Sequence, residues 1–315
     1  MQSKFSSDCL TPTVTEQTPW IALVIGNTRL HWGYFEQSRL SAVWHTPHLT
    51  QPVIHQLRQT PMRPSIWQAI AEGSNVSDIS DQTESLSSSK AVTSHLELWI
   101  ASAVPAQSAL WLTSDAVDRQ QDRQKGSSHI STYQVERSHL PLTNIYNTLG
   151  IDRAINLLGA GRVTGWPVVV IDGGTALTFT AGISEEVDQP RFYGGAILPG
   201  LRLQRESLAQ KTAALEPHIP EREKAESVLP ARWATETKGA IASGLTYSLT
   251  ATLIDYLTDW WAQFPKGKAI LTGGDATFLY QCLQQRTPEI ASRVLINQDL
   301  MFYGLRTYRT CYRTC

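Results

Sequence analysis

The chain lacks the features that mark membrane proteins, nucleic-acid-binding proteins and secreted proteins. Its net charge is −1 over 315 residues, so no excess of basic residues attracts a polyanion or an anionic membrane surface. No apolar run approaches the length of a membrane span. The polar segment before Trp20 has neither the basic start nor the apolar core of a signal peptide. We therefore expect a cytoplasmic protein without a nucleic-acid or membrane partner.

Cysteine is scarce, and several familiar catalytic signatures are missing. The four cysteines form no Cys-x-x-Cys pair, and the eight histidines do not cluster at metal-ligand spacing. The chain has no Gly-x4-Gly-Lys-Ser/Thr phosphate loop, no Gly-x-Gly-x-x-Gly fingerprint, no Gly-x-Ser-x-Gly elbow and no His-Glu-x-x-His pair. These absences argue against the enzyme classes that depend on those motifs.

The length and the hydrophobic content of 42% suffice for two domains with cores of their own. We expect a loose N-terminal segment over 1–19, a first lobe over 20–148 and a second lobe over 149–315. A Ser-rich, acidic stretch near 72–94 can bury little apolar surface, which predicts a flexible insertion within the first lobe.

One sequence pattern occurs twice, at 21–33 and again at 168–180. Each copy has a short apolar run, a tight turn that contains Gly and Thr, and then alternating residues, which predicts a strand, a glycine turn and a second strand. Glycines let the backbone approach an anion closely, and exposed amides with a Thr hydroxyl can hold phosphate oxygens. Two copies, one at the head of each half, predict two similar lobes that close on one nucleotide.

Strands and helices alternate along the rest of the chain, which predicts an α/β class with layered sheets. The Gly/Pro-rich segment 193–200 is interpreted as a chain reversal in preference to a substrate wall. We expect the remaining elements as strands at 40–44 and 96–104, a surface helix or loop at 114–125, helices within 147–161 and 201–215, a long helix at 237–261 interrupted by Gly239 and Gly244, and a strand, glycine turn and helix at 268–279.

Asp152 and Arg153 follow Gly150 where a polar loop enters a predicted helix. The carboxylate there would accept a proton from a substrate hydroxyl, while the guanidinium would hold a substrate anion. The same pair also fits a helix-start carboxylate with a surface ion pair, and the spacing alone favours that interpretation.

Asp172 ends a run of apolar residues directly before the second glycine turn. It fits either the ligand of a cation near phosphate or an Asp that caps its own turn. The segment Thr272-Gly-Gly-Asp-Ala276 fits either a nucleoside-facing turn, in which glycines keep side chains out of the ligand's path, or a plain tight turn.

Taken in order, these segments resemble type III pantothenate kinases, within the acetate kinase, sugar kinase, heat-shock chaperone and actin superfamily. The resemblance runs from about Trp20 to Tyr303, and its most specific element is Gly150-Ile-Asp-Arg153 between the hairpins. The other matching pieces are Ile25-Gly-Asn-Thr28, Asp172-Gly-Gly-Thr-Ala176, Gly194-Gly-Ala-Ile-Leu-Pro-Gly200, Thr237 ahead of Gly244, and Thr272-Gly-Gly274. The resemblance implies two similar lobes of the actin-like ATPase (ribonuclease H-like) type, a nucleotide cleft between them, and a homodimer.

The resemblance also implies an activity: ATP-dependent phosphorylation of the terminal hydroxyl of pantothenate, the first step toward coenzyme A. Asp152 would be the general base, Asp172 would bind the potassium or ammonium ion that the family requires, and Mg²⁺ would accompany ATP. The residues implied in pantothenate binding are Gly150, Ile151, Asp152, Arg153 and Thr237. Those implied in ATP binding are Ile25, Gly26, Asn27, Thr28, Arg29, Gly174, Thr175, Gly273 and Gly274.

The chain departs from the family pattern at three places. Val24 stands where the first hairpin normally has Asp, a carboxylate that would help to place magnesium. Thr180 stands where the second motif often has Asp. The family's Tyr ahead of the Gly-x-Asp-Arg element falls on Thr143, with Tyr146 three residues further on.

Two other functions stay open beside pantothenate kinase. Val24 favours a non-catalytic relative of the same fold that acts through protein contacts. The retained Asp152, Arg153, Asp172 and Thr175 argue against it. A kinase of the same superfamily with another small substrate is the third interpretation.

Overall fold

The computed structural model describes residues 18–60, 63–73, 95–121, 129–184, 189–211, 216–218 and 229–314. These residues form two compact units, each built around a five-stranded sheet. The first unit takes in the described residues up to Pro141, residues 148–155, and the end of the chain from Gly304. The second unit takes in residues 142–147 and 156–303.

The first sheet has the strand order β3-β2-β1-β4-β5. Strands β1, β2 and β3 pair antiparallel, and β4 and β5 continue the sheet parallel to β1. The predicted first hairpin is confirmed, since β1 and β2 pair on either side of the glycine turn. The strands are β1 (Trp20–Ile25), β2 (Leu30–Glu36), β3 (Arg39–Thr46), β4 (His95–Ser102) and β5 (His129–Gln134).

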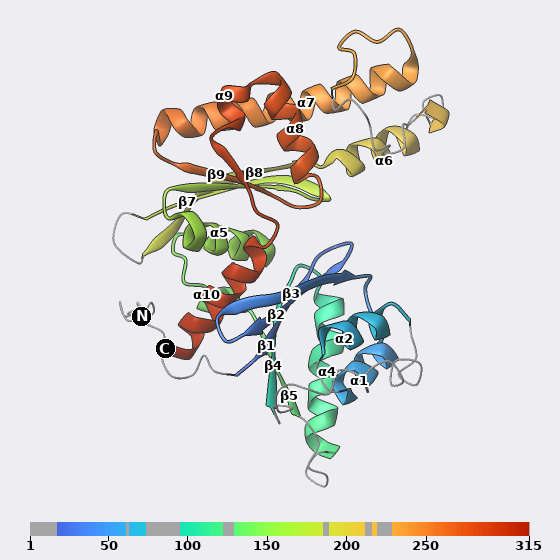
Figure 1. Cartoon of the computed structure of the whole chain (residues 1–315), viewed down its shortest axis with the longest axis vertical. Coiled ribbons are helices and arrows are strands. Elements are labelled where there is room, and N and C mark those ends of the chain that lie inside the picture. The colour runs from blue at the N-terminus through green and yellow to red at the C-terminus, as the bar shows by residue number, and fades with distance from the viewer. Residues whose placement is uncertain are drawn as a thin grey trace. The chain divides into compact units, whose positions relative to one another are not determined.

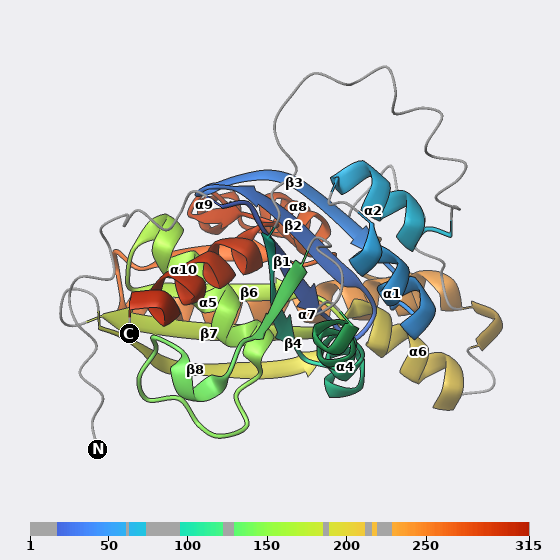
Figure 2. The same ribbon diagram turned by 90° about the horizontal axis from the view of Figure 1, so that it is seen from below.

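Helices α1 (Gln51–Gln59), α2 (Pro64–Ala71) and α4 (Pro105–Gln121) cover one face of this sheet, and α10 (Leu300–Thr314) lies on the other (Figure 1 and Figure 2). Period-2 alternation along β2 turns Leu30 and Trp32 toward α1, α2 and α4, where both side chains are buried. A 3₁₀ turn, η5 (Arg137–His139), follows β5.

A buried carboxylate fastens α10 to the sheet. Glu97 of β4 accepts hydrogen bonds from Trp99 Nε1 at 2.9 Å and from Arg309 Nε at 3.0 Å, and Arg313 adds a further ion pair. Arg309 also lies over the Trp20 ring, 4.9 Å from its centroid. Paired and hydrogen-bonded in this way, the buried charge is compensated, and the C-terminal helix belongs to the first unit.

The second sheet repeats the first in topology. Its order is β10-β9-β6-β7-β8, with β6, β7 and β8 antiparallel and with β9 and β10 parallel to β6. The second hairpin, the strand, glycine turn and helix at 268–279, and the α/β class are thereby confirmed. The strands are β6 (Val168–Gly173), β7 (Ala176–Ser184), β8 (Pro190–Pro199), β9 (Lys268–Thr272) and β10 (Val294–Ile296).

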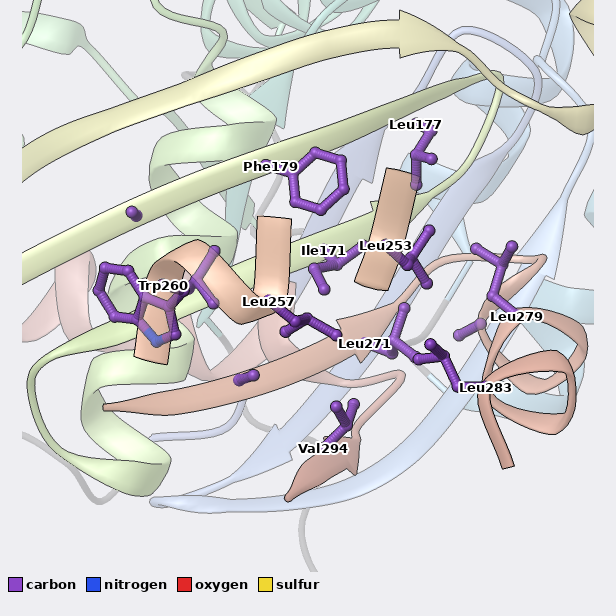
Figure 3. Packing of buried hydrophobic residues seen from close by; sticks show 14 of the residues in the cluster. Ile171, Leu177, Phe179, Leu253, Leu257, Trp260, Leu271, Leu279, Leu283 and Val294 are labelled. Atoms are coloured by element: carbon purple, nitrogen blue, oxygen red, sulfur yellow. The ribbon is translucent and has the colours of Figure 1, made fainter. Parts of the chain in front are cut away.

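Helices α7 (Thr237–Gln263), α8 (Ala276–Arg286) and α9 (Pro288–Ala291) lie on one face of the second sheet (Figure 1). Figure 3 shows the resulting core, in which Ile171 and Phe179 of the sheet meet Leu253 and Leu257 of α7, with Leu279 and Leu283 of α8 beside them. Helix α5 (Ile151–Thr164) packs on the opposite face, because Leu157 lies against Gly182 of β7. Two further elements are α6 (Leu201–Lys211) and the 3₁₀ turn η6 (Glu216–His218).

Two interpretations of glycine were wrong. The segment 193–200 is not a chain reversal, because it lies largely within β8, which pairs with β7 along its length. Helix α7 runs without a break from Thr237 to Gln263, through both Gly239 and Gly244. Glycine is tolerated on an edge strand and inside a well-packed helix, so glycines alone did not mark breaks here.

Further expectations concern the N-terminal segment, the Ser-rich stretch and the boundary between the two lobes. The N-terminal residues up to 17 and most of the Ser-rich stretch, 74–94, lie outside the described residues. The division expected at 148/149 differs from the units observed, in which 149–155 and the chain from Gly304 join the first unit. Among the described helices, none combines the length and apolar character that a membrane crossing needs.

Candidate functional site

The first glycine turn, Gly26 to Arg29, connects β1 to β2. The Gly26 amide donates to the Arg29 carbonyl at 3.0 Å, and His48 Nε2 lies 2.8 Å from the Gly26 carbonyl oxygen. Asn27, Thr28 and Arg29 are exposed, whereas Ile25 is buried at the end of β1. A closed turn with exposed residues and a guanidinium suits an anion.

The second glycine turn repeats this arrangement between β6 and β7. The Gly174 amide donates to the Ala176 carbonyl at 3.1 Å, and the Gly200 amide donates to the Thr175 carbonyl at 3.0 Å. A β-carbon on Gly200 would overlap the backbone of Gly174 and Thr175. Glycine is therefore required at position 200, where the end of β8 approaches the turn.

A third turn follows β9, from Thr272 to Asp275, and lies against the second. The Asp275 amide donates to the Gly173 carbonyl at 2.8 Å. Gly273 has φ +86°, a conformation that favours glycine, and a β-carbon there would overlap Oδ1 of Asp172. The two turns of the second unit thus meet at the Asp172 carboxylate.

Two residues next to Asp172 each carry a buried oxygen that has no hydrogen-bond partner among the described residues. Asn156 Nδ2 of α5 donates to Asp172 Oδ2 at 3.1 Å, while Asn156 Oδ1 is buried with no hydrogen-bond partner among the described residues. Thr272, which pairs with Asp172 across β6 and β9, is fully buried, and its Oγ1 also has no partner there. One carboxylate with two orphaned oxygens fits a hard cation. The described chain has no group of three or more His, Cys, Asp and Glu side chains placed to hold a metal.

Asp152 and Arg153 lie in the first turn of α5, in the first unit. The loop before the helix is fastened by Arg137, whose Nε and Nη2 donate to the Leu149 carbonyl at 3.2 and 2.9 Å. A β-carbon on Gly150 would overlap Oδ1 of Asp152, so glycine leaves room for that carboxylate. A helix N-terminus is a favourable place for the negative charge of Asp152, and Arg153 beside it is buried with only 7% exposed.

Thr237 begins α7 and borders a hollow of about 660 Å³ between α6 and α7 in the second unit. The hollow is lined mainly by apolar residues and glycine, with Thr235, Glu236 and Thr237 as its polar members. Its described lining residues are Leu208, Ala234, Thr235, Glu236, Thr237, Ala240, Ile241, Gly244 and Leu245.

The structure distributes the predicted residues over both units. Ile25–Arg29 and Gly150–Arg153 belong to the first unit, whereas Asp172, Thr175 and Thr237 belong to the second. Within the second unit, Gly174 and Gly273 lie at the Asp172 carboxylate.

The departures from the family pattern have structural settings. Val24 is buried and pairs with His31 and Ala101, as Asp172 pairs with Thr178 and Thr272 in the second sheet. Val24 therefore occupies in the first sheet the position that Asp172 occupies in the second.

The other departures lie in the second unit. Thr180 is buried in β7, where a carboxylate would lack water. Thr143 is tied to β8 by backbone hydrogen bonds, whereas Tyr146 is exposed and packs edge-to-face on Phe192 at 5.5 Å. The tyrosine nearest to the family position is therefore an exposed residue, three positions beyond Thr143.

Several residues of these sites were not among those predicted from the sequence. Arg137 bonds the loop directly before Gly150, and Asn156 bonds Asp172. His31, His45 and His48 gather around the first glycine turn. The signal available for His31 was its place in the hairpin, because residues across a tight hairpin from the end of β1 point to the same face as Val24.

Two units that repeat one sheet order, each with a glycine turn after its first strand, define the actin-like, two-lobed α/β class that includes ATPases and sugar kinases. The family model described as type III pantothenate kinase matches residues 20–259. The chain belongs to the type III pantothenate kinase family.

Individual relatives agree with this assignment. The chain is 38% identical over 291 residues to a type III pantothenate kinase of Nostoc sp., covering 92% of this chain and 94% of the relative. It is 35% identical over 295 residues to the corresponding protein of Thermosynechococcus vestitus, covering 93% and 91%. A solved Campylobacter jejuni structure described as a Baf family transcriptional activator matches with a TM-score of 0.50 at 17% identity, covering 94% of this chain and all of that one. This last likeness supports the fold alone.

Proposed function

We propose that this protein transfers the γ-phosphoryl group of ATP to the terminal hydroxyl of pantothenate, the first step toward coenzyme A. The observation that carries the proposal is the anchored start of α5, where Asp152 and Arg153 stand side by side behind a loop held by Arg137. Family membership and the repeated glycine turns support ATP as the phosphoryl donor.

Each residue group has a role in this proposal. Asp152 accepts the proton of the substrate hydroxyl as the oxygen attacks phosphorus, and Arg153 with Gly150 holds pantothenate. Thr237 adds a hydroxyl contact to the substrate. Phosphoryl transfer depends on positioning and charge neutralisation more than on covalent catalysis, so amide-lined turns and one base suffice.

Two cations complete the proposal. Asp172, with the orphaned oxygens of Asn156 and Thr272, would hold a potassium or ammonium ion. Magnesium bound to the ATP phosphates would neutralise charge that builds up in transfer. Because Val24 removes one carboxylate from the first turn, magnesium would depend on the phosphates and water for its ligands.

The test is ADP release from MgATP, with and without pantothenate, in potassium and in sodium buffer. We expect release that requires pantothenate and is faster in potassium. ATP turnover that ignores pantothenate would instead indicate a kinase with another substrate. No turnover by folded protein that still binds nucleotide would leave the non-catalytic relative, which Val24 favours.

We also propose that the protein is a cytoplasmic homodimer, as the resemblance implies. Light scattering after size-exclusion chromatography measures the mass directly. A monomer at micromolar concentration would contradict the dimer and leave the proposed reaction untouched.

A further inference from the structure

Val24, His31 and His45 form a row across one face of the first sheet. Val24 of β1 is paired with His31 of β2, and His31 is paired with His45 of β3. Paired residues on neighbouring strands point to the same face, with their β-carbons about 5 Å apart. The row starts two residues before Gly26, so it borders the first glycine turn.

The two imidazoles are in direct contact. Nδ1 of His31 lies 3.0 Å from Nδ1 of His45, and the rings meet edge-to-face with centroids 4.8 Å apart. A β-carbon on Gly26 would lie 3.7 Å from His31 Nε2. His31 therefore has one ring nitrogen on His45 and the other beside the glycine turn.

The surroundings of His31 are positively charged or neutral. Burial, His45 and Arg29, in that order, lower the pKa of His31 to about 4, so the imidazole is neutral at physiological pH. Arg29 faces it from the turn, and His45 faces it from β3. His48 is the other titratable group at the turn, where its Nε2 lies 2.8 Å from the Gly26 carbonyl oxygen. Val24 and Ala101 bring no charge from β1 and β4. The matching row in the second sheet has Asp172 in place of Val24, so the first row is suited to an anion where the second is suited to a cation.

We propose that His31, supported by His45, binds a phosphate oxygen of the nucleotide through Nε2–H and takes up a proton from solvent as the phosphates bind. This inference rests on the proposed function, because the anion is the phosphate chain of ATP at the first glycine turn. In the bound state His31 Nδ1–H donates to His45 Nδ1, and His31 Nε2–H donates to the phosphate oxygen.

The physical reason is the reversal of local charge on binding. In the free protein, burial desolvates the imidazolium of His31, and a protonated His45 and then Arg29 repel it. A neutral His45 does not repel the imidazolium and instead accepts a hydrogen bond from it through Nδ1. Incoming phosphate brings negative charge that offsets Arg29 and stabilises the imidazolium, and a hydrogen bond to a charged donor is stronger than one to a neutral donor. The chain would thereby meet phosphate with an imidazolium beside Val24, the position for which the family resemblance implies a carboxylate.

The experiment is calorimetric binding of the non-hydrolysable analogue AMP-PNP with Mg²⁺ at pH 6, in two buffers of different protonation enthalpy. The buffer dependence gives the number of protons taken up. For the wild type we expect at least about half a proton more per bound nucleotide than for His31→Gln. The nucleotide's own titration contributes equally to both proteins and cancels in the difference.

Further variants separate the two histidines from general effects. His31→Gln should bind about tenfold more weakly at pH 6, with a smaller deficit at pH 8. His45→Ala removes the acceptor for His31 Nδ1–H and should lower proton uptake, while His45→Gln restores an acceptor and part of the uptake. His55→Gln is the control, because His55 lies on α1 and contacts Gln59; its proton uptake should equal that of the wild type.

Three results would overturn the inference. AMP-PNP binding with the same proton uptake in wild type and His31→Gln would show that His31 does not respond to the phosphates, while the proposed function would stand. Proton uptake that is absent with Mg²⁺ and present without it would instead indicate that His31 ligates the metal. Absence of nucleotide binding altogether would contradict both the inference and the proposed function.

Discussion

Asp152 is the residue on which the proposed chemistry depends most directly. Asp152→Asn keeps the size of the side chain and removes its basicity, so AMP-PNP and pantothenate should still bind. We expect turnover to fall about 10²–10⁴-fold, the contribution typical of a general base. Steady-state ADP release, with calorimetric binding beside it, measures both quantities.

The matched control is Asp255→Asn, an exposed carboxylate on α7, which should leave turnover unchanged. Turnover of Asp152→Asn at the wild-type rate would remove Asp152 as the base. Equal losses in both variants would point to folding instead of chemistry.

His31 also predicts how the stability of the protein depends on pH. Its pKa of about 4 in the folded protein lies below 6.5, the value of an ordinary imidazole. Between pH 6.5 and 4 the unfolded chain therefore binds more protons at this site than the native state, and the free energy of unfolding falls as the pH is lowered.

Denaturant titrations at pH 7 and pH 4.5 measure this loss. His31→Gln cannot titrate, so its loss of stability over the same interval should be smaller than that of the wild type. An identical pH dependence in the two proteins would mean that the imidazole is not desolvated by its surroundings.

Val24 offers a complementary test at the neighbouring position. Val24→Asp places a carboxylate beside His31, and the opposite charge should raise the pKa of that imidazole from about 4 toward its ordinary value or beyond. An NMR titration of the His31 ring measures the change. Val24→Asn, which is polar but uncharged, is the control and should leave the pKa of His31 close to that of the wild type.

At the scale of residues, the sequence predicted the glycine turns but not which side chains meet across neighbouring strands. Gly26, Gly174 and Gly273 were predictable, because a glycine directly after a short apolar run is typical of a tight turn at the end of a strand. The contact between His31 and His45 was not, since the two residues are 14 positions apart and a one-residue change of register would place them on opposite faces.

At the scale of elements, a close contact between helices α5 and α10 shapes the first unit. A β-carbon on Gly304 of α10 would overlap the carbonyl oxygen of Ile155 on α5 and would lie 3.0 Å from Ile155 Cγ2. The backbone of α5 cannot move aside as a flexible side chain could, so glycine at this position lets the two helices approach.

Gly304→Ala should therefore lower the free energy of unfolding by about 1–3 kcal/mol, the usual range for overpacking. The control is Gly244→Ala on α7, where the structure shows nothing within 4 Å of the added carbon. That change should raise stability by roughly 0.5–1 kcal/mol, because alanine is the better helix former. Chemical denaturation of both variants checks the opposite signs, and a stabilising Gly304→Ala would refute the close approach.

The position of β8 in its sheet explains why the glycines and the proline of 193–200 do not form a chain reversal. Gly194 and Gly195 lie in the interior of β8, but β8 is at the edge of its sheet, where weak strand formers and proline are tolerated. Pairing with β7, a long-range effect, outweighs the local preference. Helix α7 shows the same effect, since packing of Leu253 and Leu257 on the sheet maintains the helix beyond Gly244.

At the scale of the molecule, the sequence predicted the duplication of the fold but not the boundaries of the two units. The hairpins at β1–β2 and β6–β7 indicated a duplicated fold, because each is a local pattern. The return of α10 to the first unit depends on Arg309 meeting Glu97, 212 positions away, and no local pattern predicts that contact. The first unit therefore combines segments from both ends of the chain, which a single cut of the sequence into two halves does not reproduce.

Equivalent positions of the two sheets differ in charge, with Val24 in the first sheet and Asp172 in the second. This difference leads to a prediction about the stability of the whole protein. Asp172, with orphaned oxygens on Asn156 and Thr272, should hold a monovalent cation that the equivalent position of the first sheet, Val24, cannot hold. A ligand that binds only the native state stabilises it by mass action, by about 1.4 kcal/mol when its concentration is ten times Kd. For a protein of this size the thermal midpoint should rise by a few degrees in potassium chloride over sodium chloride at equal ionic strength.

The variant Asp172→Asn should abolish that difference, because it removes the negative charge that attracts the ion. Asp255→Asn, exposed and remote in sequence, should retain it. If wild type and Asp172→Asn respond equally to the two salts, any potassium dependence of turnover must arise elsewhere. If only the wild type responds, the cation binds in the absence of nucleotide, and the second sheet carries its metal independently of the reaction.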